Sequence, residues 1–222
     1  MTEGTLIIGQ IYKLGSPDEK YEDFDSLIRG GLKIGYGQAA MGIFSPAAFK
    51  LGGLKYKGQP FIPFFILDSN SFKYGTADNP WKDDFWIEEG FVLYHGDSKE
   101  GKDIFSSTGN RKILGVLEQY FNPELKALAP PMLVTRHVEV NGNKKGYRKI
   151  VGYGYPEKTY VEVQREKNSG KYFTNLKIKV LLLSKEQEEV SMAWLDDRRD
   201  HGLSPAEMLR NAPLAWKKWL NN

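Results

Sequence analysis

The stretch that decides the fold is residues 132–183, MLVTRHVEVNGNKKGYRKIVGYGYPEKTYVEVQREKNSGKYFTNLKIKVLLL. It contains four runs, LVTRHVEV, KIVGYGY, TYVEVQRE and YFTNLKIKVLLL, that alternate apolar and polar residues or are continuously apolar. Such runs are typical of strands, and Asn141-Gly142-Asn143 and Asn168-Ser169-Gly170 provide turn residues between them. The stretch therefore predicts an antiparallel meander.

The residues before this meander predict shorter elements. Thr5–Lys13 has strand character, Gly15–Pro17 is a turn, and Tyr21–Ile28 predicts a short helix. Residues 30–58 are rich in glycine and predict loops around short extended pieces. Ile62–Leu67 is a continuous apolar run of strand length.

A hairpin, a helix and a helical tail complete the expected organisation. Trp86–His95 predicts a hairpin that turns near Glu89–Gly90. Asn110–Phe121 has apolar residues at helical spacing, with Asn110 or Thr108 as its N-cap and Pro123 after its end. In the tail, Ser184-x-x-Gln187 and Ser204-Pro205-x-Glu207 both match the capping box that begins a helix.

These elements predict one α+β domain over residues 1–222, with a curved, mostly antiparallel sheet of six to eight strands. Its parts are a glycine-rich segment (1–80), a segment with the hairpin, helix and meander (81–183), and a helical tail (184–222) that packs across the strands. Because a sheet of this size with many glycines tends to close and remove its exposed edges, we expect a β-barrel with flanking helices.

Composition excludes several classes of protein. The chain has no cysteine, which excludes disulfides and thiolate metal sites, and its three histidines, at positions 95, 137 and 201, are far apart. We therefore expect neither a metal site nor a cofactor. No segment reaches the roughly 20 apolar residues of a membrane helix, and the N-terminus does not resemble a signal peptide, so we expect a cytoplasmic protein without a membrane partner. Walker A, Gly-x-Ser-x-Gly and Gly-x-Gly-x-x-Gly motifs are missing.

The segment from Trp81 to Arg111 is the candidate functional site. Aromatic residues among charged ones provide what stacking on an extruded base requires. Trp81, Trp86 and Tyr94 are the candidate pocket walls, and the Asp97 carboxylate can accept a hydrogen bond from the N4 amino group of cytosine. The alternative interpretation is a charged hairpin loop beside a capped helix.

Basic residues follow the candidate pocket along the chain. The net charge is +3 and the isoelectric point is about 8.8, which is only weakly basic, but lysine and arginine cluster at 99–112 and 136–149. The alternative interpretation is that these two clusters are solvent-exposed loops that do not bind DNA. The candidate contacts to the DNA backbone are Lys99, Lys102, Asn110, Arg111, Arg136 and Arg148.

Two other patterns suggest chemistry. Asp97-Ser98-Lys99, with Asp83 or Asp84 as a first acid, matches part of a magnesium-dependent nuclease motif, although no Pro-Asp precedes a strand as usual. His201 follows a run of acids and arginines, which could serve general acid–base catalysis or form a solvated helix end.

Two segments resemble a known family. YHGDSKEGKDIFSSTGNRKIL (94–114) is similar to the Y-x-G-D-x-K … G-N-R-x-L pattern of the N-terminal domain of AspBHI-like modification-dependent restriction endonucleases. WLDDRRDHGLSPAEMLRNAPLAWKKWL (194–220) is similar to the W-x-x-x-R-R-D … A-P-x-x-W-x-x-W ending of the same domain. With the strands between them, the resemblance covers roughly 81–220.

The resemblance implies an SRA-like barrel related to the PUA superfamily, which binds double-stranded DNA and flips 5-methylcytosine or 5-hydroxymethylcytosine into a pocket. It also implies a nuclease, as a further domain or a partner protein, and leaves a homodimer open. The expected function is binding, by base flipping, of DNA that contains a modified cytosine (5-methyl-, 5-hydroxymethyl- or glucosylated), in restriction or antiviral defence. The alternative is a DNA glycosylase acting on the flipped base, with Asp97, Asp68 or His201 as catalytic candidates.

Overall fold

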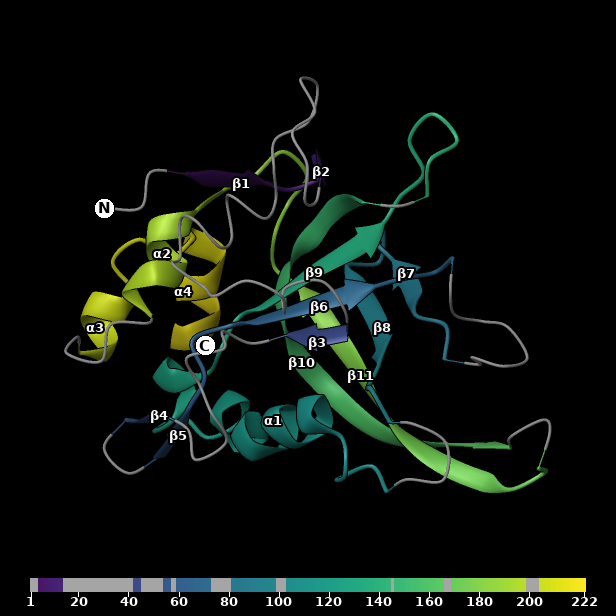
Figure 1. Cartoon of the computed structure of the whole chain (residues 1–222). Helices are drawn as coiled ribbons and strands as arrows, with labels where there is room; N and C mark the ends of the chain where they lie inside the picture. The colour runs from purple at the N-terminus through teal and green to yellow at the C-terminus, as the bar shows by residue number, and fades with distance from the viewer. Residues whose placement is uncertain are drawn as a thin grey trace.

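The computed structural model describes residues 4–13, 42–44, 54–56, 59–72, 81–98, 103–144, 146–165, 169–198 and 204–222. They form an α+β fold in which α2, α3 and α4 gather at one side of a central sheet and α1 lies at another (Figure 1). The strands are β1 (Thr5–Ile7), β2 (Ile11–Lys13), β3 (Gly42–Phe44), β4 (Leu54–Tyr56), β5 (Gln59–Phe61), β6 (Phe65–Ser69), β7 (Asp84–Trp86), β8 (Phe91–His95), β9 (Met132–His137), β10 (Tyr147–Arg165), β11 (Tyr172–Leu182) and β12 (Glu189–Ser191). The helices are α1 (Thr108–Val116), α2 (Met192–Asp197), α3 (Pro205–Met208) and α4 (Leu214–Asn221), with 3-10 turns η2 (Leu117–Tyr120) and η3 (Lys126–Leu128).

The predicted meander forms the centre of an eight-stranded sheet. Its order is β3-β6-β9-β10-β11-β8-β7, and β2 pairs with β10 beside this path. The neighbouring pairs are antiparallel except for β6 and β9, which run parallel. The longest ladder joins β10 to β11, from Gly154 opposite Leu182 to Arg165 opposite Tyr172. The prediction of a mostly antiparallel sheet is confirmed.

The predicted barrel is wrong, because the described sheet is open: its path ends at β3 on one side and at β7 on the other. The glycines that suggested closure have a different use in β10. A Cβ atom on Gly154 would fall 1.7 Å from the Leu181 carbonyl oxygen. Glycine therefore allows a close approach of two strands there, and it does not bend the sheet into a cylinder.

The N-terminal segment forms two short strands instead of the one predicted over Thr5–Lys13. Gly9, with a positive φ of 89°, lies in the turn between them. β1 then pairs with β12 and β2 pairs with β10, so the turn passes the chain from one sheet to another. The helix predicted over 21–28 lies outside the described residues.

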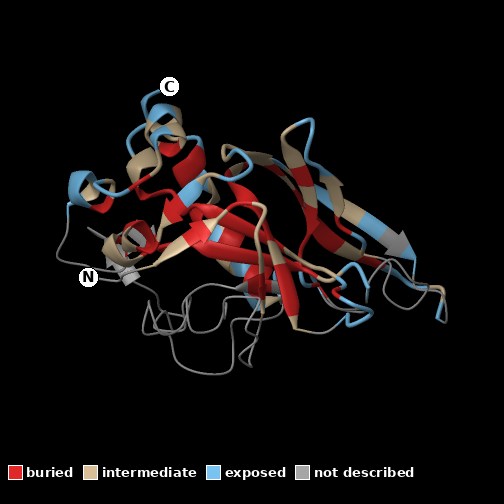
Figure 2. Cartoon of the chain, turned by 90° about the horizontal axis from the view of Figure 1, so that it is seen from above, coloured by how far each residue is buried: buried red, intermediate tan, exposed pale blue. Residues whose placement is uncertain are grey.

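Two hydrophobic clusters lie on the sheet, and Figure 2 shows the buried residues concentrated around the central strands. One cluster joins β1, β12 and the tail to the sheet and includes Trp194 and Trp216, whose rings lie 5.6 Å apart. The other packs Ile113 and Val116 of α1 onto the sheet residues Leu67 and Ile178. The prediction that the tail packs across the strands is confirmed. Within the described residues, no helix has the length and apolar character needed to cross a bilayer.

One predicted capping box is present and the other is absent. Ser204 and Glu207 form the reciprocal bonds of a capping box, and Pro205 begins α3. Ser184 begins no helix, because its Oγ accepts a hydrogen bond from the backbone N–H of Tyr153 in the sheet, at 3.1 Å. Gln187 has a left-handed φ of 63°, which turns the chain into β12.

Arg198, from the tail motif that resembles the restriction endonucleases, holds the helical tail to two loops. Its buried guanidinium donates to the carbonyl oxygens of Pro63, Leu128 and Ala129 at 2.5, 2.9 and 3.0 Å. Burial lowers the pKa of Arg198 from 12.5 to about 10, which leaves it charged at neutral pH. A planar group with several donors is suited to binding carbonyls from two segments at once.

We predict that Arg198→Met destabilises the protein, because the three carbonyl oxygens lose their donor in a buried region. The expected loss in free energy of unfolding is on the order of 3 kcal/mol, measured by urea denaturation. Arg210→Met, which removes an exposed arginine from the same tail, is the control and should change stability little. Equal losses in the two variants would show that Arg198 does not hold the tail.

Candidate nucleic-acid interface

The hairpin predicted over Trp86–His95 is confirmed as β7 and β8, and its alternation sorts its side chains between two faces. Val92 and Tyr94 are buried in the cluster beneath α1. His95 lies on the opposite face from Tyr94, since successive side chains of a strand point to opposite sides. The hairpin therefore directs Tyr94, a predicted pocket residue, into the core and His95 to the opposite face of the sheet.

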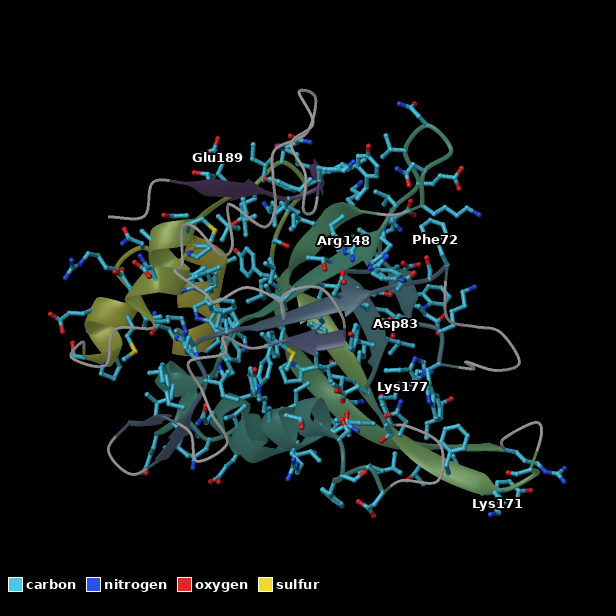
Figure 3. All side chains as sticks on the ribbon, in the orientation of Figure 1. Phe72, Asp83, Arg148, Lys171, Lys177 and Glu189 are labelled. Carbon is cyan, nitrogen blue, oxygen red and sulfur yellow. The ribbon has the colours of Figure 1, made fainter. Side chains whose placement is uncertain are left out.

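His95 is the centre of a charged and aromatic cluster at the end of β8. Its Nε2 lies 2.7 Å from Glu162 Oε2, and its Nδ1 lies 3.5 Å from Asp83 Oδ1. The same Asp83 oxygen accepts the His95 backbone N–H at 2.7 Å, and Lys177 Nζ lies 3.6 Å from Glu162. Figure 3 shows Asp83 and Lys177 in the same region of the molecule.

The pKa of His95 is raised above its ordinary value of 6.5. Burial lowers this pKa, but the hydrogen bonds and negative charges of Asp83 and Glu162 together raise it by more. The charged imidazolium is therefore favoured, which holds the two carboxylates on either side of one ring.

Trp81 covers this cluster with an aromatic ring. Its ring centroid lies 5.6 Å from that of His95 and 5.0 Å from that of Phe173, which it meets edge-on. Trp81 is half-buried, so part of its surface is available to a ligand. The cluster fixes this indole at the end of β8, two residues before Asp97.

Asp97 is exposed and stands at the beginning of α1. Its Oδ1 accepts hydrogen bonds from the hydroxyl of Ser107 and from the backbone N–H of Asn110, the latter at 3.2 Å. A helix N-terminus carries a partial positive charge, which attracts the oxygen atoms of this side chain. Oδ2 makes no hydrogen bond within the part of the chain that the structure describes. The arrangement gives a fixed anionic acceptor at the surface.

The predicted pocket residues are only partly brought together. Trp81 packs on His95 at the end of β8, and the Asp97 carboxylate bonds Ser107 and Asn110 at the start of α1. Trp86 is 48% exposed at the other end of the hairpin, where it stacks on Phe91 with ring centroids 6.0 Å apart. Tyr94 is buried, and its hydroxyl donates to the Asp68 carbonyl oxygen at 3.3 Å. Trp86 and Tyr94 therefore do not join Asp97, because strand alternation and the length of the hairpin separate them.

The residues predicted to contact the DNA backbone also fall into two groups, those that reach the surface and those that are buried. Arg111 is exposed on α1, and Arg136 is half-buried, with its guanidinium 5.6 Å from the ring centroid of Phe85. Asn110 is fully buried, and Arg148 is 4% exposed and paired with Asp68 at 2.9 Å. These two side chains have structural partners and do not face solvent. Lys99, Lys102 and His201 lie outside the described residues.

Asp68, a candidate for glycosidic-bond cleavage, is buried in a polar network. One oxygen accepts from Thr135 Oγ1 at 2.8 Å, and the other lies 3.1 Å from both His137 Nε2 and Arg148 Nε. A carboxylate with these three partners is a structural ion in the sheet. Among the described residues, no three His, Asp or Glu side chains are arranged to hold a metal ion.

A basic hairpin is the feature that sequence reasoning missed. β10 and β11 continue beyond the rest of the sheet, and Lys171 lies near the outer end of this hairpin (Figures 1 and 3). The basic residues on it are Lys158, Arg165, Lys171, Lys177 and Lys179. Lys158 and Lys171 are exposed, whereas Lys177 and Lys179 pair with Glu162 and Glu157. The signal available in the sequence was the alternation of these cations with apolar residues over two long strands.

We predict that His95 makes the stability of the protein depend on pH. Because its folded pKa is raised, its contribution is complete below the unfolded pKa of about 6.5 and is lost as pH rises through the folded value. Relative to His95→Gln, the wild-type protein should lose its stability advantage in this window, measured by thermal unfolding between about pH 6 and 9. Glu162→Gln, which removes one facing carboxylate, should move the loss to lower pH. A constant difference across the range would contradict this account.

Comparisons with known proteins agree with the sequence pattern. A scan against protein families matches residues 6–222 to the family described as "Restriction endonuclease AspBHI N-terminal". A search of curated proteins found no match. Among solved structures, MspJI restriction endonuclease in complex with a 27-mer oligonucleotide is 27% identical, with a TM-score of 0.79 over 97% of this chain.

Two further solved structures share the fold at lower identity. The DNA recognition domain of the cytosine modification-dependent restriction endonuclease LpnPI is 20% identical, with a TM-score of 0.64, and the match covers 90% of this chain and 82% of that one. The DNA modification-dependent restriction endonuclease AspBHI is 18% identical, with a TM-score of 0.66 over 99% of this chain and 51% of that one. The chain likewise spans 51% of the MspJI chain. Because the family match covers almost the whole sequence, the chain belongs to the family of restriction endonuclease AspBHI N-terminal domains.

Proposed function

We propose that this chain binds double-stranded DNA that contains a modified cytosine, and that it reads the base after flipping it from the helix, as an SRA-like domain would. Family membership supports binding of modified DNA. The LpnPI domain is described as the recognition domain of a cytosine modification-dependent enzyme, and MspJI was solved with an oligonucleotide. The nuclease that such a reader serves is a further domain or a partner protein.

The observation that carries the proposal is the exposed Asp97 carboxylate, held at the N-terminus of α1 two residues after His95, on which Trp81 packs. Cytosine presents an N4 amino donor, and a carboxylate oxygen is a suitable acceptor for it. Thymine presents O4 at the same position, which an anion repels. A fixed Asp97 therefore favours cytosine over thymine, and the nearby indole of Trp81 offers a surface on which a flipped ring can stack.

The surrounding cations support binding of the DNA backbone. Arg111 is exposed on α1 just beyond Asp97, and Arg136 lies at the end of β9. Lys99 and Lys102 follow Asp97 in sequence. We include Lys158 and Lys171 of the long hairpin, because phosphate contacts need exposed cations and carry most of the sequence-independent affinity.

The contacts favour a reader over an enzyme that uses the proposed acids. Asp83 is bonded to His95 and Asp97 is bonded to the start of α1, so the two acids of the partial nuclease motif are engaged in separate places. Asp68 is surrounded by three polar partners in the sheet. Neither arrangement leaves a pair of carboxylates facing a common substrate atom.

We predict that Asp97→Asn abolishes discrimination between 5-methylcytosine and thymine. Two duplexes that differ only at one position, with 5-methylcytosine or thymine opposite an abasic site so that neither base is paired, present bases that differ at N3 and at the 4-position. The wild-type protein should prefer 5-methylcytosine by about 1–3 kcal/mol in fluorescence anisotropy titrations. The variant should lose this preference, because the Asn amide can accept a hydrogen bond from N4 of 5-methylcytosine or donate one to O4 of thymine.

Asp103→Asn is the matched control, because it removes one negative charge from an exposed position before α1. It should keep the wild-type preference. An Asp97→Asn protein that is folded and still prefers 5-methylcytosine by the full margin would show that Asp97 does not read the base.

We also predict that Lys158→Gln and Lys171→Gln each weaken binding to modified and unmodified duplexes by the same factor. Each loss of a phosphate contact should reduce the slope of log K against log salt concentration by about 0.9. Lys218→Gln, on the exposed face of α4, should leave the slope unchanged. If all three variants behave alike, the long hairpin does not bind the DNA backbone.

A further inference from the structure

We propose that two buried asparagines, Asn110 and Asn175, are positioning residues that hold Asp97 for base recognition. This inference rests on the proposed function of Asp97. It concerns residues that touch neither the base nor the backbone of the DNA. Three observations carry it: the bonds of each amide, the bonds of the carboxylate, and the packing of two glycines.

Asn175 holds the backbone on both sides of Asp97. It is fully buried on β11, its Nδ2 donates to the Gly96 carbonyl oxygen at 2.8 Å, and its Oδ1 accepts the Ser98 backbone N–H at 3.2 Å. One side chain thus binds the residue before and the residue after Asp97. The segment follows the last residue of β8, and the last backbone bond to β11 there is from the Gly96 N–H to the Leu176 carbonyl oxygen, at 2.7 Å.

Asn110 holds Asp97 itself from the side of α1. It is also fully buried, and its Oδ1 accepts the Asp97 backbone N–H at 3.1 Å. Its Nδ2 donates to Ser98 Oγ and to the Ile104 carbonyl oxygen, both at 3.0 Å, and lies 3.4 Å from Asn175 Oδ1. The two amides therefore form one connected network between β11 and α1.

Capping of α1 does not account for these bonds. The structure places Ser107, and neither Asn110 nor Thr108, at the N-cap, where its hydroxyl accepts the Asn110 backbone N–H at 3.4 Å. A capped helix needs no buried amide at its third residue, and burying an amide costs free energy unless its bonds are made. Here those bonds end mainly on residues 96–98, the segment that presents the carboxylate.

The packing of two glycines shows how closely this segment is enclosed. A Cβ on Gly96 would fall 2.1 Å from Asn110 Oδ1 and 2.9 Å from Asn175 Oδ1. A Cβ on Gly109 would fall 2.6 Å from Asp97 Oδ2. The backbone before Asp97 can reach both amides only because residue 96 has no side chain. The carboxylate is thereby fixed before DNA binds, which reduces the entropy that binding would otherwise lose.

The test uses the full chain and the affinity ratio for the 5-methylcytosine and thymine duplexes defined above. Asn175→Leu keeps a side chain that branches at Cγ and removes the amide bonds. Ser107→Gly removes the hydroxyl bond to the carboxylate and retains an acceptable N-cap residue. Each variant should lower the affinity ratio by about tenfold. This loss is smaller than the full discrimination that a base-edge contact can provide, because Asp97 itself is still present. Neither should alter the salt slope, since no phosphate contact is lost.

Thr135→Val is the matched control, because it removes a buried hydroxyl that bonds Asp68 and has no bond to residues 96–98. It should lower the thermal stability and keep the ratio. In the double variants, Asn175→Leu or Ser107→Gly added to Asp97→Asn should cause no further loss, because the positioning residues act through Asp97.

The outcomes separate the two proposals. If Asp97→Asn loses the ratio while folded Asn175→Leu and Ser107→Gly keep it, the positioning proposal is overturned and the reader stands. If a double variant loses more of the affinity ratio than Asp97→Asn alone, the positioning proposal is also overturned, because the second residue would then act independently of Asp97. If Asp97→Asn keeps the ratio, both proposals fall. Should Asn175→Leu not fold, Asn175→Ala, which removes the same amide bonds without adding side-chain volume, decides the question.

Discussion

The structure depends on the antiparallel ladder between β10 and β11. β10 also pairs with β2 and β9, and β11 pairs with β8, so the remaining strands of the large sheet attach on either side of these two. The inner residues of β11, such as Ile178, bury the apolar face of α1, and the start of β10 contributes Ile150 to the cluster under the tail. The outer part of the same ladder continues as the basic hairpin. One long pairing therefore builds the core and presents charge to a partner.

The register of that ladder also places the polar groups of the candidate site. Lys177 lies opposite His95, and Asn175, two residues earlier, lies beside the end of β8. The first position brings the salt-bridged cluster of Asp83, His95 and Glu162 against Trp81. The second brings a buried amide against the backbone around Asp97. A slip of one residue would turn both sets of side chains to the opposite face.

Much of the fold could be predicted from alternation and turn residues. The meander, the Trp86–His95 hairpin and the α3 capping box are local patterns, so the sequence contains their physical cause. The barrel and the Ser184 helix were wrong for non-local reasons: closure depends on which edge strands meet, and Ser184 bonds Tyr153 in a distant strand. The site was predicted less completely. The sequence singled out the segment that contains Asp97 and Trp81, whose roles stay predictions, whereas the bond between Asn110 and Asn175 joins residues 65 positions apart. No local signal distinguishes a buried amide from an exposed one.

We propose that Asp97 reads a flipped cytosine whose ring stacks on Trp81. A crystal structure of this chain with a duplex that contains one 5-methylcytosine tests it most directly. We expect the base to lie outside the helix, with its N4 within hydrogen-bond distance of Asp97 Oδ2 and its ring stacked on Trp81. A base that stays paired within the duplex, or that occupies a site away from the end of β8, would contradict it.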